Sequence, residues 1–294
     1  MAHMESTSTV KHPVSSPLIA DLISLALQED LSLGDVTSEL TIEPSQRAKA
    51  SIRAKEDLVV CGGGWLIEEI SAAAALPLSL LSYKDDGERV RSGGSIAELE
   101  GSARTLLSIE RTVLNFLQHL SAIATHVDSV MKQTTKLMVL DTRKTLPGYR
   151  ILEKYAVRVG GARNHRMSLG DMILIKDNHI AANGGDLRTT LVRVFERKAP
   201  YMPVEVEVTS LEEIRVALEF PVQVLLLDNM DDVMLSKAVT LVRKSSPDVL
   251  LEASGRVTQE RFATFEKIGI DTVSMGALTY GASHVDISMD IVLE

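Results

Sequence analysis

Six short apolar segments recur along the second half of the chain, and each of them ends in polar residues or glycine. They lie at residues 137–141, 172–175, 204–208, 222–228, 249–254 and 271–275. Short apolar strands that alternate with helical or irregular stretches are typical of βα units around a parallel sheet. Since a complete (β/α) barrel has eight strands, the pattern favours an incomplete barrel, with a doubly wound open sheet as the alternative.

The first third of the chain has a mixed pattern, in which helices and strands are both expected. The chain has 294 residues, which at roughly 150 residues per domain suggests one large or two ordinary domains. Apolar residues at helical spacing predict helices over 17–29, 65–75 and 108–131, and strand-like stretches cover 50–54 and 58–61. The predicted class is therefore α/β, with a mixed first domain followed by the incomplete barrel.

Composition excludes several classes of function. The chain has 31 Lys and Arg against 40 Asp and Glu, a net charge of −9, which argues against broad nucleic-acid binding. Its single cysteine, Cys61, excludes an intrachain disulfide framework and a multi-cysteine zinc site, and fits a reducing compartment such as the cytoplasm. No apolar run approaches the ~20 residues of a membrane span, so no membrane role is expected.

Basic residues gather between positions 143 and 166, which predicts an anion site. The basic residues are Arg143, Lys144, Arg150, Lys154, Arg158, Arg163 and Arg166, against one acid, Glu153. Lys154 and Arg158 stand one turn apart and are expected on a solvated helix face. Thr142, Arg143 and Lys144 instead follow a predicted strand, and His165 and Arg166 follow two glycines. Arginine binds carboxylate or phosphate with two parallel bonds, and lysine supplies a mobile charge.

Four further charged residues lie in or directly after predicted strands. Lys176 follows an apolar run and could neutralise a ligand anion, form a Schiff base, or make a structural ion pair. In residues 204–208 the alternation puts Glu205 and Glu207 on one face, and the role of Glu205 stays open. Glu207 and Asp228 could hold a magnesium ion with waters, or bind the hydroxyls of a sugar.

The ends of the last two strands, each with a glycine, point to a phosphate site. They are Ser254-Gly255-Arg256 and Ser274-Met275-Gly276-Ala277. Glycine at a βα turn lets backbone N–H groups approach a phosphate, and barrels commonly bind phosphate after their last strands. The chain has no Gly-x-Gly-x-x-Gly or Walker sequence, so a dinucleotide or ATP fold is disfavoured.

Several long segments, in order along nearly the whole chain, resemble quinolinate phosphoribosyltransferases, also called nicotinate-nucleotide pyrophosphorylases (carboxylating). They are GDVTS at 34–38, ERTVLNFLQHLS at 110–121, DTRKTLPG at 141–148, NHR at 164–166, LIKDNH at 174–179, VEVEV at 204–208, LDNM at 227–230, LEASG at 251–255 and SMGALT at 274–279.

The resemblance implies a fold and a reaction. An N-terminal α/β sandwich would cover 13–118, joined by the C-terminal segment 281–294, and an incomplete α/β barrel of the type II phosphoribosyltransferase kind would cover 119–280. The implied reaction joins quinolinate to phosphoribosyl pyrophosphate with magnesium, giving nicotinate mononucleotide, pyrophosphate and carbon dioxide in de novo NAD synthesis. A homodimer or higher oligomer that shares active-site residues is also implied.

The resemblance also implies residue roles. Arg143, Lys144, His165, Arg166 and Lys176 would hold the two quinolinate carboxylates, with Arg111 supplied by the neighbouring subunit, although sequence pattern alone makes Arg111 one more solvated charge. Glu207 and Asp228 would bind the ribose hydroxyls and magnesium, and Ser254, Gly255 and Gly276 the 5′-phosphate. Ala162, where a third glycine is frequent in the family, and Tyr280-Gly281, where His-Ser is frequent, depart from the family pattern.

Three other interpretations remain at this point. A phosphoribosyltransferase that uses nicotinate would share the phosphate site but needs fewer cations around the pyridine ring. A Schiff-base aldolase would use Lys176 as its nucleophile. A non-catalytic sensor of phosphorylated metabolites would bind without turnover.

Overall fold

The computed structural model describes residues 16–255 and 257–294, so Arg256, one of the predicted phosphate contacts, lies outside the described residues. The chain divides into two compact units. The first comprises the described residues up to Ser129 together with Thr145–Gly161 and Leu278–Glu294, and the second comprises Val130–Lys144 and Ala162–Ala277. The sequence-based limits, 13–118 with 281–294 and 119–280, remain a prediction.

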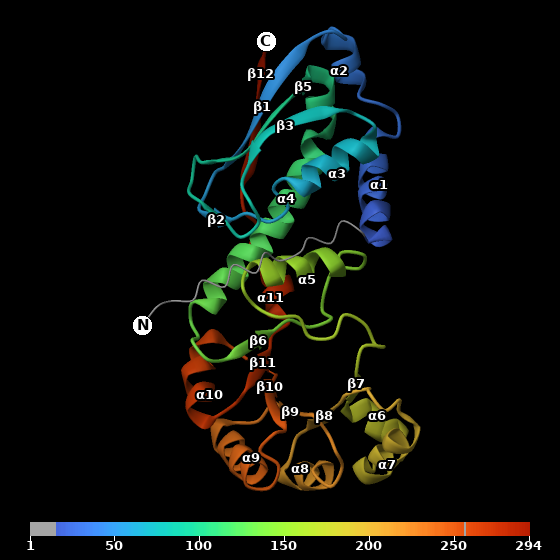
Figure 1. The fold of residues 1–294 in the computed structure, drawn as a ribbon, viewed down its shortest axis with the longest axis vertical. Helices are drawn as coiled ribbons and strands as arrows, with labels where there is room; N and C mark the ends of the chain where they lie inside the picture. Colours follow the sequence, from blue (N-terminus) through green and yellow to red (C-terminus); the bar gives the residue numbers. More distant parts are fainter. Residues whose placement is uncertain (1–15, 256) are drawn as a thin grey trace. The chain divides into compact units, whose positions relative to one another are not determined.

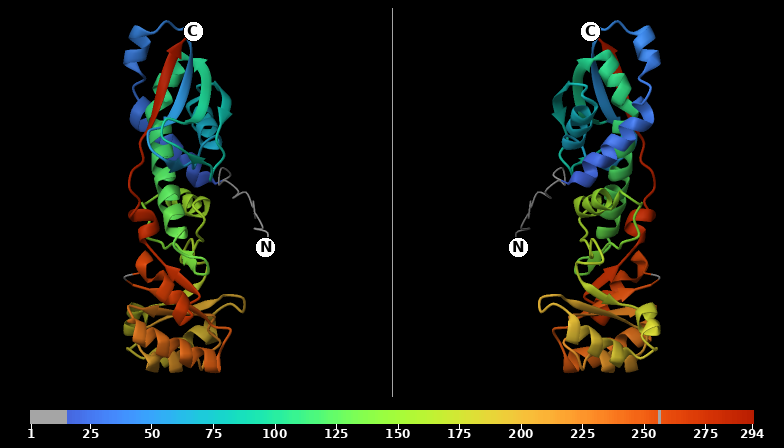
Figure 2. Two further views of the ribbon diagram at one scale, coloured as in Figure 1. Left: turned by 90° about the vertical axis from the view of Figure 1, so that its left-hand side faces the viewer. Right: turned by 90° about the vertical axis from the view of Figure 1, so that its right-hand side faces the viewer.

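An antiparallel sheet forms the first unit, with the strand order β12-β1-β5-β3. β1 (Arg47–Ala54) buries every second side chain, which is the alternation that a sheet with one covered face requires. β12 (Ile287–Leu293), from the end of the chain, pairs with β1 along its length, as Figure 2 shows. β5 (Ser95–Ser102) and β3 (Leu78–Tyr83) complete this sheet, and β2 (Leu58–Val59) pairs antiparallel with β4 (Arg89–Val90) in a separate two-stranded sheet.

Helices pack beside this sheet. α1 (Pro17–Leu31) starts at a proline, which fits a first helical position, and α3 (Trp65–Ala74) lies against it. α4 (Ala103–Met131) buries Val113, Leu117 and Leu120 at four- and three-residue spacing, and starts directly after β5, five residues before the predicted start. α2 (Val36–Thr41) is capped by Asp35, whose side chain accepts a hydrogen bond from Ser38 N.

The basic helix after residue 149 belongs to the first unit, and it is solvated at Arg158, as expected, but not at Lys154. α5 (Arg150–Val159) buries Lys154 completely, so the expectation of a solvated Lys154 is wrong. Tertiary contacts within the unit explain the burial: the Tyr155 hydroxyl donates a hydrogen bond to Asp86, and Glu153 Oε1 lies 3.0 Å from His119 Nε2. A buried charge needs such a polar environment, and sequence spacing gives no sign of it.

The second unit contains a six-stranded parallel sheet within the described residues, in the order β6-β11-β10-β9-β8-β7. All six predicted strands are confirmed, as β6 (Met138–Leu140), β7 (Ile173–Ile175), β8 (Val204–Val208), β9 (Val224–Asp228), β10 (Leu250–Ser254) and β11 (Thr272–Ser274). Figure 1 shows α7, α8, α9 and α10 in a row along the outer side of the curved sheet, the arrangement of an incomplete barrel.

The helices of this unit follow the strands in sequence. They are α6 (Asp177–Ala182), α7 (Leu187–Arg197), α8 (Leu211–Ala217), α9 (Asp232–Ser245), the short 3-10 helix Gln259–Arg261, α10 (Phe262–Ile268) and α11 (Ala277–Tyr280), which runs on into the first unit. Parallel pairing places the carboxyl ends of neighbouring strands at one edge of the sheet, and the register sets Ser254 opposite Asp228. Within 16–255 and 257–294, none of the helices combines the length and the apolar character that crossing a bilayer requires.

Candidate active site

A pocket of about 310 Å³ opens at the carboxyl ends of the barrel strands. Basic residues form much of its wall, and they come from three separate segments that follow β6, precede β7 and follow β7. The lining residues are Thr142, Arg143, Lys144, His165, Arg166, Leu174, Lys176, Leu226, Glu252, Ser254 and Ser274. The structure therefore brings together the five basic residues that the sequence assigned to an anion site in the barrel.

Asp141 joins two of these segments. It is fully buried at the end of β6, where Oδ2 accepts a 2.6 Å hydrogen bond from Asn164 Nδ2 and Oδ1 accepts a 2.9 Å bond from His165 N. Arg163 adds a parallel bridge to Leu140, with Arg163 N donating to Val139 O at 2.9 Å. The loop with Arg143 and Lys144 is thus held beside the loop with His165 and Arg166.

The imidazole of His165 lies against protein atoms at both of its nitrogens. Nε2 is 3.0 Å from Glu205 Oε2 and 3.7 Å from Glu252 Oε2, and Nδ1 accepts a 2.8 Å hydrogen bond from Arg166 N. Only 10% of the side chain is exposed. The side chain of Glu205, whose role the sequence left open, is completely buried beneath it.

Burial and like charge act together on the Arg166 guanidinium. Desolvation, and then repulsion from Arg143, lowers its pKa, and the Glu205 and Asp171 carboxylates oppose that shift. One nitrogen, Nη1, donates a 3.3 Å hydrogen bond to the carbonyl of Met172. An anionic ligand would relieve the repulsion between the two guanidinium groups, so this wall of the pocket favours an anion.

Lys176 forms an ion pair with Glu207 across neighbouring strands. Its Nζ donates to Glu207 Oε2, and 42% of the lysine side chain is exposed. Lys176 is also the N-cap of α6, and its backbone N donates a 2.9 Å hydrogen bond to His179 Nδ1. The structural ion pair, one of the three roles weighed from the sequence, is therefore present.

Glu252 places a carboxyl group in the middle of a buried strand. Burial, and then repulsion from Glu205, raises its pKa to about 7, while His165, Ser274 and Thr272 oppose the shift. Sequence reasoning missed this residue as part of the site. An acid inside the apolar run of residues 249–254 was the available signal, because a buried carboxyl group needs a partner or a proton.

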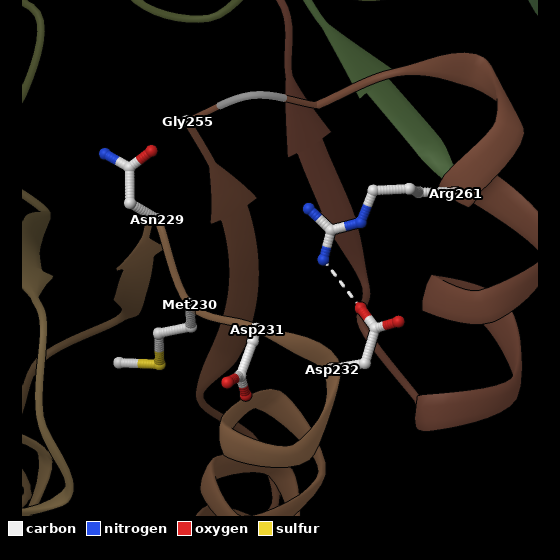
Figure 3. A pocket seen from close by; sticks show the side chains of 6 residues that line it. All are labelled: Asn229, Met230, Asp231, Asp232, Gly255 and Arg261. Atoms are coloured by element: carbon white, nitrogen blue, oxygen red, sulfur yellow. Dashed lines mark hydrogen bonds and ion pairs between the residues drawn. The ribbon is translucent and has the colours of Figure 1, made fainter.

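A larger cavity of about 600 Å³ lies next to the loops that follow β9 and β10, as Figure 3 shows. Asn229 and Gly255 face it from two loops, and Arg261 pairs with Asp232 at 2.6 Å on its other side. Gly255 has φ +75°, and a Cβ there would collide with the Asn229 side chain. Asn229, also missed from the sequence, adopts a positive φ of 52° and its N donates to Ser254 O at 3.0 Å.

Four other predicted residues, Met275, Gly276, Ala277 and Arg111, are not among the residues that line this pocket. Met275 N donates a 2.9 Å bond to Leu140 O, which ties the end of β11 to β6, and Gly276 and Ala277 follow at the start of α11. Arg111 lies on α4 in the first unit, where its side chain is 60% exposed and its Nη2 atom is 3.9 Å from Glu110 Oε1.

Two groups of side chains could hold a cation. Glu207 and Asp228 end neighbouring strands, and Asp228 Oδ2 accepts a 2.7 Å bond from Asn229 Nδ2. Two carboxylates suit Mg²⁺ that keeps its waters and bridges to substrate phosphates, so these residues fit that ion. Among the described residues, ligand atoms of His165, Glu205 and Glu252 also lie within 4.8 Å of one another.

Comparisons with known proteins match both units. Residues 35–121 match the quinolinate phosphoribosyl transferase N-terminal domain, and residues 121–290 match the C-terminal domain. A nicotinate-nucleotide pyrophosphorylase (carboxylating) from Mycobacterium leprae is 39% identical over 277 residues, covering 92% of this chain and 96% of that protein.

A mitochondrial quinolinate phosphoribosyltransferase (decarboxylating) from Nicotiana glauca is 37% identical, covering 94% of this chain and 83% of its own. The crystal structure of NadC from Streptococcus pyogenes superposes with a TM-score of 0.86 at 36% identity, covering 94% of this chain and 97% of that one.

Proposed function

The chain belongs to the quinolinate phosphoribosyltransferase family, and we propose that its barrel pocket carries out the reaction for which that family is named. The chain is an enzyme that transfers a phosphoribosyl group to quinolinate with decarboxylation, a step of NAD biosynthesis. Phosphoribosyl pyrophosphate is the second substrate. The products are nicotinate mononucleotide, pyrophosphate and carbon dioxide.

The gathering of basic side chains in one pocket carries this proposal. Arg143, Lys144, Arg166 and Lys176 line it together, in a chain whose net charge is −9. Quinolinate carries two carboxylates, and bidentate guanidinium contacts with nearby ammonium charges suit two anionic groups on one ring. A nicotinate-using enzyme has one carboxylate to bind, so this number of cations favours quinolinate.

The acidic residues at the next strand ends suit the sugar. We assign the ribose hydroxyls and magnesium to Glu207 and Asp228, and the 5′-phosphate to Ser254, Gly255, Gly276 and their neighbours Met275 and Ala277. Bound magnesium would offset negative charge on the departing pyrophosphate. The two carboxylates stabilise positive charge at the anomeric carbon as the bond to pyrophosphate breaks, and the pocket needs no covalent nucleophile.

Carbon dioxide then leaves from the ring. The new bond between the anomeric carbon and the ring nitrogen makes the pyridine cationic, and the electrons of the breaking carbon–carbon bond remain on a ring carbon that this cation stabilises. A proton replaces the lost carboxyl group. Lys144 and Lys176 hold the carboxylates in place during both steps.

The other interpretations have less support. A Schiff-base lysine needs an amine that is free to attack a carbonyl, and the Nζ atom of Lys176 is engaged in an ion pair with Glu207. A metabolite sensor would bind these ligands without turnover. The site instead has carboxylate side chains that can stabilise positive charge at the anomeric carbon, and cationic side chains that can bind an anionic substrate. This combination suits catalysis.

We further propose that the enzyme works in the cytoplasm as a homodimer or higher oligomer in which Arg111 completes the neighbouring subunit's site. The exposed Arg111 side chain can reach a second copy, and its charge would add to a quinolinate site. The single, buried Cys61 is compatible with a reducing compartment.

One assay tests the reaction directly. Purified protein receives phosphoribosyl pyrophosphate, Mg²⁺ and either quinolinate or nicotinate, and nicotinate mononucleotide and carbon dioxide are measured. Equal amounts of both products from quinolinate, with none from nicotinate, are expected. Product from nicotinate and none from quinolinate would overturn the assignment of the pyridine pocket. No product from either substrate would contradict the proposed reaction and favour the aldolase or the sensor.

A further inference from the structure

The arrangement around His165 gives this residue a role different from that of the neighbouring cations. A side chain that binds a substrate carboxylate must direct an N–H group at it. In His165, Nδ1 accepts a hydrogen bond from Arg166 N, and Nε2 faces two carboxylates of the barrel, at 3.0 Å and 3.7 Å. Both ring nitrogens are therefore already engaged by the protein.

The bond at Nδ1 fixes the tautomer. A nitrogen that accepts a hydrogen bond carries no proton, so the proton of the neutral ring is on Nε2, which faces Glu205 and Glu252. The side chain of Glu205 is completely buried, and neither of its oxygens is in a hydrogen bond with another described residue, while Nε2 of His165 lies 3.0 Å from Oε2. The Nε2–H group lies within hydrogen-bond distance of that buried carboxylate, and turning it toward a ligand would take this donor away from Glu205.

The cluster could also be considered as a metal site, since its three ligand atoms lie within 4.8 Å of one another. The surrounding charge argues against this. Arg166 interacts with both Glu205 and Arg143, and Lys144 lines the same pocket. Several fixed positive charges repel a divalent cation, whereas an N–H group satisfies the same carboxylates with no added charge of its own.

We propose that His165 is a positioning residue that holds Arg166 for a quinolinate carboxylate, and that Glu205 and Glu252 hold His165 in turn. The backbone of Arg166 is fixed through Nδ1, while the backbone of His165 is fixed by Asp141 at 2.9 Å. The guanidinium group then extends from a main chain whose two preceding amide groups, His165 N and Arg166 N, are both held by hydrogen bonds. This inference rests on the proposed function for the identity of the ligand, although the geometry does not depend on it.

Two variants separate positioning from direct contact. In His165→Asn, the amide oxygen occupies the place of Nδ1 and can accept the bond from Arg166 N, but nothing reaches the place of Nε2. In His165→Gln, the longer amide reaches the place of Nε2 and cannot reproduce Nδ1. Calorimetry with quinolinate alone, and KM for quinolinate in the full reaction, are measured for both variants, with the melting temperature as a check of folding.

Positioning predicts that His165→Asn binds quinolinate within about threefold of the parent, and that His165→Gln binds at least about tenfold more weakly. Glu205→Gln keeps an oxygen for the Nε2–H group and should stay near the parent, while Glu205→Ala should behave like His165→Gln. The reverse order of the two His165 variants would overturn the proposal in favour of a direct Nε2 contact with substrate.

A second measurement is independent of activity and of the stability of variants. Nitrogen-15 NMR of histidine-labelled protein, with His165 assigned by His165→Asn, reports which ring nitrogen carries a proton. The expected spectrum is an Nε2–H tautomer that quinolinate leaves unchanged. A ring that gains a second proton when quinolinate binds would refute the proposal. If the protein binds no quinolinate at all, the proposed function fails, and the ligand-free spectrum still tests the tautomer.

Discussion

Asn164 Nδ2 donates a 2.6 Å hydrogen bond to the Oδ2 atom of the buried Asp141, and this bond connects two loops that carry the cations of the pocket. Asp141 follows β6 directly, and Asn164 precedes His165. Both loops are short and polar and bury few apolar side chains. The hydrogen bond from Asn164 to the buried Asp141 carboxyl group therefore holds the two loops in fixed positions relative to each other.

Exchanging the two side chains tests this connection. Asp141→Asn sets two amide groups against each other and should raise KM for quinolinate by about 10- to 100-fold, since a hydrogen bond to a buried charge contributes about 1.5–3 kcal/mol. Adding Asn164→Asp restores a donor–acceptor pair with reversed polarity and should recover part of that loss. Steady-state kinetics of the single and double variants give the coupling. If the free-energy loss of the double variant equals the sum of the losses of the two single variants, the bond does not organise the pocket.

Removing one pocket cation should weaken use of quinolinate. Lys144→Ala and Arg166→Ala should each lower kcat/KM by the equivalent of about 2–4 kcal/mol, because a desolvated anion loses a charged partner. Arg163→Ala is the matched control, since Arg163 lies in the same loop with an exposed side chain. Unchanged kinetics in the first two variants, or an equal loss in the control, would contradict the pocket assignment.

The raised pKa of Glu252 makes folding depend on pH. The folded protein keeps this proton up to about pH 7, whereas an unfolded chain releases it near the ordinary value of 4.5. The folded state therefore binds more protons between these values, so its free energy of unfolding falls as pH rises through them, by about 3 kcal/mol.

Glu252→Gln removes this dependence. Relative to the parent, the variant should gain stability as pH rises from 4.5 to 8, in urea unfolding followed at several pH values. Glu43→Gln, at an exposed position, makes the same chemical change without the burial and should follow the parent curve. A parent and a Glu252→Gln variant that stay parallel across this range would contradict the raised pKa.

Gly255 is expected to tolerate no side chain. Its φ of +75° disfavours any other residue, and an added Cβ would displace Asn229 next to Asp228. Gly255→Ala should raise KM for phosphoribosyl pyrophosphate by about tenfold or more and leave quinolinate binding unchanged. Gly184→Ala shares the positive φ, at +87°, but meets no atom within 4 Å, so it controls for backbone strain alone. Equal effects of the two changes would mean that strain, and not the contact with Asn229, is responsible.

Mixing two inactive variants tests whether subunits share a site. Arg111→Ala and Glu207→Ala should each abolish turnover, because one removes a cation from quinolinate and the other an acid from the sugar. If Arg111 completes the neighbouring site, mixed oligomers contain some sites with both residues intact, and part of the activity returns. Exchange of subunits is verified with two affinity tags. Verified exchange without recovered activity would refute the shared site.

The positions of the barrel strands could be predicted closely because the hydrophobic pattern of a few neighbouring residues is enough to indicate a buried strand. The strand predicted from the alternation at residues 204–208 has the same bounds as β8. The strand predicted at residues 222–228 ends where β9 ends and starts two residues before it. The same local reasoning failed for Lys154, since helical spacing of charges predicts a solvated face and contacts from distant residues bury it.

The sequence by itself determined which chemical groups are available and where the strands that carry them begin and end, including the basic run after β6 and the acids at the ends of β8 and β9. Only the tertiary structure decided which groups meet. β6 pairs with β11 and β7 with β8, so residues far apart in the chain surround His165. The physical reason is that strand order, register and burial depend on long-range packing, and these set both the partner of a buried charge and its pKa.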